Sequence, residues 1–84
     1  MVQLSFLPTS VHLHRIEPDE NMHRYYRMHL APDLFGGCAL VREWGRIGVS
    51  CRREIELHES EGEAQSRLLI VTRQKKRRGY VAVV

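Results

Sequence analysis

The sequence predicts an α+β fold, in which a single antiparallel β-sheet of four to five strands packs against one α-helix. Two observations support this class. Apolar and polar residues alternate before residue 60, and the period then changes from two residues to that of a helix. A chain of 84 residues has room for one small core. We therefore expect a single domain over residues 1–84, with its core at about 10–84.

Four strands are expected before the helix. The clearest is 22–30, where a period of two over the whole segment is typical of a half-buried strand. Turn residues separate the segments, and short connections between antiparallel strands predict a meander. The four strands are 11–17, 22–30, 38–44 and 50–58, with a turn at 18–21 and a loop at 31–37.

The alternation also assigns faces. In the second strand it places Tyr26, Met28 and Leu30 toward the core. In the fourth strand it places Cys51, Ile55 and Leu57 on the apolar side.

The helix is expected from about Glu61 to Arg77. Ser60 and Glu63 fit a capping box, in which Ser60 is the N-cap and the Glu63 side chain reaches back to it. Acidic residues lie at the positive end of the helix dipole and basic residues at the negative end. Gly79 is expected to stop the helix, and 80–84 to form a short last strand.

One tripeptide combines unusual chemistry. Trp44-Gly45-Arg46, continued as Ile47-Gly48, is predicted to lie in a hairpin turn, where both glycines can take conformations closed to other residues. The indole offers a stacking plane and the guanidinium a bidentate fork for an oxyanion. The alternative is a core tryptophan beside an ordinary turn.

The order of these segments resembles the WGR domain, a family named for its Trp-Gly-Arg motif. The resemblance covers roughly residues 10–84 and rests on the Asn21…Tyr25-Tyr26 strand, the motif itself, the helix and the basic stretch into Gly79-Tyr80. The family occurs in poly(ADP-ribose) polymerases, in bacterial regulators and as stand-alone bacterial proteins. The resemblance implies one antiparallel sheet crossed by one helix.

The resemblance also implies a function. In polymerases that sense DNA breaks, this module binds DNA ends and contacts neighbouring domains through the Trp and Arg of the motif. By similarity, Trp44 would stack at a strand terminus and Arg46 would hold a phosphate or a partner group. Family members commonly continue with a Gly-Gln-type turn. This chain has Val49-Ser50-Cys51-Arg52 instead, which leaves the geometry of end binding open.

Basic charge is concentrated at the C-terminal end. Residues 64–84 carry six basic and no acidic side chains, whereas the preceding part carries seven basic and ten acidic ones. Such segregation suggests a polyanionic partner. The run Lys75, Lys76, Arg77 and Arg78 is either a phosphate-binding patch or solubilising charge matched to the helix dipole. Tyr25 is either a stacking residue or a cross-strand packing residue.

The sequence gives little support for a metal site, a disulfide or catalysis. His12, His14, His23 and His29 lie on strands without the convergent Cys ligands that structural zinc sites usually have, so we expect no metal and no cofactor. Cys38 and Cys51 are expected to be free thiols, offset too far along the sheet to form a disulfide. No motif pairs either of them with an oriented base, so we expect no enzymatic activity.

The sequence therefore predicts a cytoplasmic, monomeric, non-catalytic module. No apolar run spans a bilayer, and the first residues lack a signal-peptide pattern, so no membrane partner is expected. The expected partner is nucleic acid, bound at DNA ends or breaks through phosphate contacts. The site residues would be Trp44, Gly45, Arg46, Lys75, Lys76, Arg77 and Arg78. The alternative is docking of the Trp-Gly-Arg turn against a protein with an acidic surface.

Overall fold

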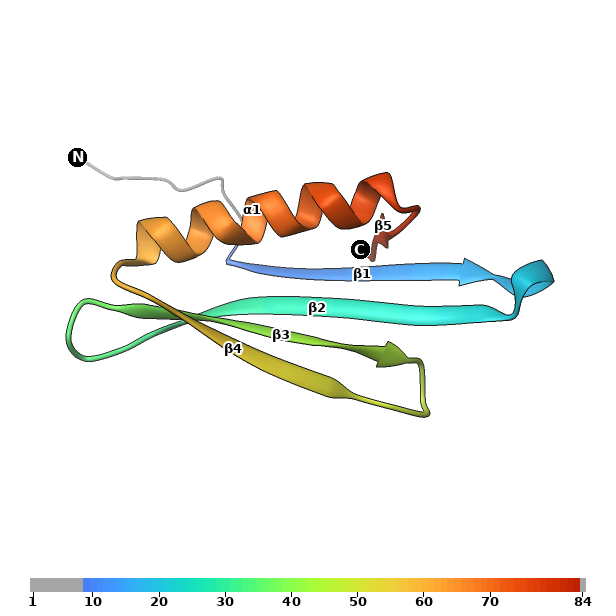
Figure 1. Ribbon diagram of the computed structural model, residues 1–84, viewed down its shortest axis with the longest axis horizontal. Helices are drawn as coiled ribbons and strands as arrows, with labels where there is room; N and C mark the ends of the chain where they lie inside the picture. The colour runs from blue at the N-terminus through green and yellow to red at the C-terminus, as the bar shows by residue number, and fades with distance from the viewer. Residues whose placement is uncertain (1–8, 84) are drawn as a thin grey trace.

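Within the described part of the chain, five antiparallel strands form one sheet and a single α-helix crosses one of its faces, as the sequence predicts (Figure 1). The computed structural model describes residues 9–83. The strand order in the sheet is β4-β3-β2-β1-β5. The strands are β1 (Ser10–Glu17), β2 (Met22–Pro32), β3 (Cys38–Arg46), β4 (Arg52–His58) and β5 (Val81–Ala82), and the helix is α1 (Glu61–Arg77).

The core lies between α1 and the inner face of the sheet, which is the face toward the helix. Strand alternation brings Leu13 of β1, Tyr26 and Met28 of β2 and Leu40 of β3 onto this face, where all four are buried. The helix contributes Ala64, Leu68 and Val71 at helical spacing. The inward assignment of Tyr26 and Met28 is confirmed, and Leu30 packs partly buried against the same cluster.

Both ends of α1 are as expected. The Ser60 side chain accepts a hydrogen bond from the Glu63 amide at 3.2 Å. Only this half of the capping box forms among the described residues. At the other end Gly79 has φ of 97°, and the amides of Gly79 and Tyr80 donate to the carbonyls of Lys76 and Lys75. This is a Schellman ending, and it turns Tyr80 back onto the sheet before β5.

The Trp-Gly-Arg motif lies in a strand, contrary to the prediction of a turn. β3 continues through Arg46, because residues 44–46 pair with residues 24–26 of β2. The turn follows at residues 47–51, where Gly48 has φ of 73°. Gly45 is not in the left-handed region. It is needed instead for space, since a Cβ on Gly45 would overlap the carbonyl oxygen of Ser50.

The apolar side of β4 faces away from the helix, which the alternation alone could not reveal. Ile55 and Leu57 are 56% and 81% exposed, and Cys51 precedes the strand in an exposed position. The inner side of β4 is polar because Arg42 of β3 forms ion pairs with Glu54 and Glu56 there. Arg67 of α1 reaches the same Glu56 at 3.2 Å. Charged groups rather than apolar packing therefore connect this edge strand to the helix.

Candidate nucleic-acid interface

Trp44 lies on the inner face of the sheet, beyond the end of the apolar core. It pairs with Tyr26 across β2 and β3, and the two rings stack with centroids 5.7 Å apart and an interplanar angle of 17°. The indole is only half-buried. One side of Trp44 therefore packs against the core, as the alternative interpretation of the sequence expects, and the rest of the indole is exposed on the inner face.

Lys75 lies over two aromatic rings beside Trp44. Its ammonium nitrogen lies 4.5 Å from the ring centroid of Tyr26 and 5.7 Å from that of Tyr80. The Schellman ending of α1 explains this arrangement, because it fixes Lys75 in the last turn and brings Tyr80 beneath it. Burial lowers the pKa of Lys75, and the charges of Arg78 and Arg42 lower it further.

Arg46 connects the ends of two hairpins. Its guanidinium donates to the backbone oxygen of Asn21 at 3.0 Å and to the Asn21 side-chain oxygen at 3.1 Å. Asn21 can present both oxygens because it ends the β1–β2 turn in the left-handed region, with φ of 54°. The Arg46 amide also donates to Ser50 Oγ at 2.9 Å. These bonds orient the guanidinium and leave the remaining N–H donors of its five for another group.

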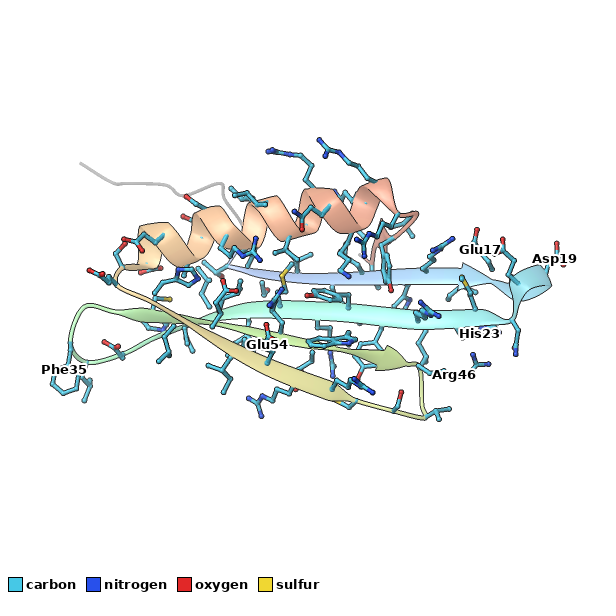
Figure 2. The ribbon with its side chains drawn as sticks, in the orientation of Figure 1. Glu17, Asp19, His23, Phe35, Arg46 and Glu54 are labelled. Atoms are coloured by element: carbon cyan, nitrogen blue, oxygen red, sulfur yellow. The ribbon has the colours of Figure 1, made fainter. Side chains whose placement is uncertain are left out.

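These side chains line a cleft of about 470 Å³ at one end of the inner face. Figure 2 shows Arg46 and His23 at this end of the sheet and Phe35 at the opposite end. Among the described residues, no carboxylate lines the cleft. Its lining consists of Arg24, Tyr26, Trp44, Gly45, Arg46, Ser50, Arg52, Lys75 and Tyr80.

Four of the seven residues expected from the sequence meet in the cleft: Trp44, Gly45, Arg46 and Lys75. The other three, Lys76, Arg77 and Arg78, are exposed at the end of α1 and do not line it. The reason is geometric, because successive helical residues point about 100° apart and cannot all face one ligand.

Sequence reasoning missed two cations of the cleft. Arg24 pairs with Arg46, and Arg52 pairs with Trp44, so both lie directly beside the motif on neighbouring strands. Arg24 could have been found from the sequence, since it lies two residues before Tyr26 and therefore on the same face of β2. Arg52 could be found only from the strand register, which places four cationic side chains around the Trp44–Tyr26 stack.

The comparisons with known proteins agree with this architecture. The family model for the WGR domain matches residues 9–84. The chain belongs to the WGR domain family. It is also 40% identical over 73 residues to "Uncharacterized protein y4dW" of Sinorhizobium fredii (strain NBRC 101917 / NGR234). The match covers 87% of this chain and 36% of that relative, so this chain spans about a third of the relative's length. No solved structure gives a significant match.

Other candidate chemistry is not assembled in the described part of the chain. Within residues 9–83, no three His, Cys, Asp or Glu side chains are placed to hold a metal ion. Cys38 and Cys51 are free thiols, and burial raises the pKa of Cys38. No helix among these residues is long and apolar enough to cross a membrane.

Proposed function

We propose that this WGR domain binds the end of a nucleic-acid strand, with DNA as the partner, through the cleft around Trp44. The single observation that carries the proposal is the composition of the cleft. Four cationic side chains surround two stacked aromatic rings, and none of the described residues that line the cleft is acidic. Phosphates need such cations, and an exposed base or sugar at a strand end can contact the indole.

Each side chain has a separate role in this proposal. Arg46 is held by Asn21 and directs its free N–H groups to a phosphate, for which a guanidinium is the better geometric match than an ammonium. Trp44 contacts the terminal nucleotide. Lys75 supplies a compact charge, and a bound phosphate would relieve the destabilising burial of that charge. Lys76, Arg77 and Arg78 lie outside the cleft and attract the polyanion from a distance.

The second candidate is docking of an acidic protein surface in the same cleft. The half-buried Trp44 favours it, because tryptophan and arginine are the side chains most enriched at the centres of protein interfaces. The part of such docking that rests on the apolar contact of Trp44 responds little to salt, whereas phosphate binding weakens steeply as salt rises.

We further propose that the domain acts without catalysis, cofactor or membrane, as a cytoplasmic monomer. The two free thiols fit a reducing compartment. The buried, raised-pKa thiol of Cys38 is a poor nucleophile.

The test compares a blunt, 5′-phosphorylated duplex with a covalently closed circle of the same sequence, by fluorescence anisotropy over a salt series. We expect the linear duplex to bind more tightly, with a log–log salt slope of about −0.9 per phosphate engaged. Arg52→Gln should weaken end binding, because it removes a cation beside Trp44. Arg73→Gln, on an exposed part of α1, is the matched control and should change binding far less.

Equal binding of the two DNA forms would contradict the end-binding proposal. If no DNA form binds at low salt, the protein-docking candidate takes its place.

A further inference from the structure

A second cavity lies on the outer face of the sheet, which is the face away from α1. Its volume is about 450 Å³. Strand alternation places its side chains opposite the core residues Leu13 and Tyr26. No role in the proposed end binding uses this face. The cavity is lined by His12 and His14 of β1, Tyr25 and Arg27 of β2, and residues 47–51 of the β3–β4 turn.

Gly45 allows the β3–β4 turn to form one wall of this cavity. It pairs with Tyr25 on the outer face, and its missing side chain leaves room for the turn to fold over the sheet. The carbonyl oxygen of Ser50 fills the position that a Cβ of Gly45 would take. The Tyr25 hydroxyl donates to this carbonyl at 3.2 Å. The turn and the tyrosine therefore hold each other in place, and the cavity is built by the fold.

The floor combines one aromatic plane with three nitrogen-bearing side chains. The Arg27 guanidinium carbon lies 5.1 Å from the ring centroid of Tyr25. His12 and His14 are the cross-strand partners of Arg27 and Tyr25. Their two rings meet edge to face, with centroids 4.7 Å apart. Among the described residues, neither imidazole has a hydrogen-bonding partner, and the one carboxylate near Arg27 is Glu43 at 3.5 Å.

We propose that this outer-face cavity binds a nucleotide, with the base against the Tyr25 ring and the phosphate between Arg27 and the two histidines. A ring beside convergent N–H donors is the recognition chemistry of an aromatic group that carries an anion. The volume lies within the usual range of small-ligand sites. The nucleotide is either free or part of a single strand. Of the residues that line this cavity, Ser50 alone is also among the described residues that line the cleft around Trp44.

His12 makes this binding depend on pH. Burial lowers the pKa of His12, and the charges of His14 and Arg27 lower it further, which favours the neutral imidazole. A bound phosphate favours the protonated imidazole, so binding should be tighter at pH 6 than at pH 8. The other titratable or charged groups that face His12 from the surrounding elements are His14, Tyr25, Arg27, Glu43 and Cys51.

The test measures how tightly the whole chain binds each of three ligands, by NMR titration at pH 6 and pH 8. The ligands are adenosine monophosphate, adenosine and inorganic phosphate. We expect the nucleotide to bind at least tenfold more tightly than either fragment, and more tightly at pH 6. Arg27→Gln and Tyr25→Leu should each weaken it at least fivefold. Tyr25→Phe keeps the ring and should retain binding, which separates stacking from the hydrogen bond to Ser50.

Arg24→Gln is the matched control, because Arg24 lies on the inner face and lines the other cleft. Unchanged nucleotide binding in this variant supports the outer site. Loss of binding in Arg24→Gln with no change in Arg27→Gln would place the nucleotide in the inner cleft and overturn the proposal, as would the absence of nucleotide binding at both pH values.

A short oligothymidylate distinguishes the two sources of the ligand. If it binds and Arg27→Gln weakens it, the ligand is a strand; if only the mononucleotide binds, the ligand is a free nucleotide. Binding of duplex ends, measured with Arg52→Gln, reports on the inner cleft alone, so the two proposals can fail separately.

Discussion

Lys75 and Lys76 are neighbours with the same chemistry but different surroundings. Lys75 lies over the rings of Tyr26 and Tyr80, whereas Lys76 is exposed outside the cleft. We expect Lys75→Met to weaken binding of a phosphorylated duplex end about tenfold, the size of one lost charge-assisted hydrogen bond. Lys76→Met should weaken it less than about threefold, since an exposed charge acts only at long range.

Fluorescence anisotropy at fixed salt measures both variants. Methionine keeps the apolar stem of lysine, so thermal midpoints should stay close to that of the parent protein. Equal losses of affinity in the two variants would mean that the phosphate does not enter the cleft.

At the scale of elements, the β3–β4 hairpin depends on the absence of one side chain. Gly45→Ala places a methyl group against the Ser50 carbonyl, and the turn must move to accommodate it. We expect a loss of about 1–3 kcal/mol of stability from this overpacking. Urea unfolding measures it. Gly62→Ala is the control, because its Cβ would meet only Ser60 Oγ at 3.9 Å, and it should not destabilise the protein.

The helix start gives a second prediction at this scale. Ser60→Ala removes the acceptor for the Glu63 amide, which should cost about 0.5–2 kcal/mol. Urea midpoints of the two proteins decide it. Indistinguishable midpoints would show that the cap contributes nothing to stability.

Much of the fold could be predicted because it is recorded in local patterns. The alternation in β2 and the Ser60 and Gly79 caps each involve residues close in sequence. The path of β3 could not be read this way, since residues 44–46 are held in the sheet by β2, about twenty residues earlier. Which side of β4 is turned toward the helix likewise depends on residues of another strand, through the ion pairs of Arg42 with Glu54 and Glu56.

The residues of the candidate site also differ in whether local sequence is enough to find them. The motif pointed to Trp44 and Arg46, but Arg24 and Arg52 join them only through strand register. The outer cavity needed the same information, because His12 and Arg27 become neighbours only when β1 pairs with β2.

At the scale of the whole molecule, Glu56 connects the sheet to the helix. Its carboxylate lies 2.7 Å from the His58 ring nitrogen and 3.2 Å from Arg67 of α1. Burial alone would raise the pKa of Glu56, but the hydrogen bond from His58 and the charges of Arg67 and Arg42 outweigh it and hold the pKa below its usual value. A lowered carboxyl pKa contributes stability above the pKa of the unfolded state, and this contribution is lost as pH falls through the folded value.

We therefore expect Glu56→Gln to be less stable than the parent at pH 7, by roughly 1–2 kcal/mol. The difference should shrink between about pH 5 and pH 3, because the parent then loses its own charge. Urea unfolding across this range measures both. A difference that stays constant with pH would mean that the ionised carboxylate is not what stabilises the protein.

The cations of the cleft and the exposed basic residues at the end of α1 are expected to attract nucleic acid in different ways. Lys76, Arg77 and Arg78 form an exposed basic end outside the cleft, so their field reaches any nucleic acid regardless of its ends. We expect the double variant Lys76→Glu, Arg77→Glu to weaken binding to linear and covalently closed DNA by the same factor. Its preference for ends should persist, because Arg24, Arg46 and Arg52 still surround Trp44. Anisotropy with both DNA forms at two salt concentrations measures this, and circular dichroism checks that α1 remains folded. A selective loss of end binding would instead place the exposed basic end in direct contact with the terminus.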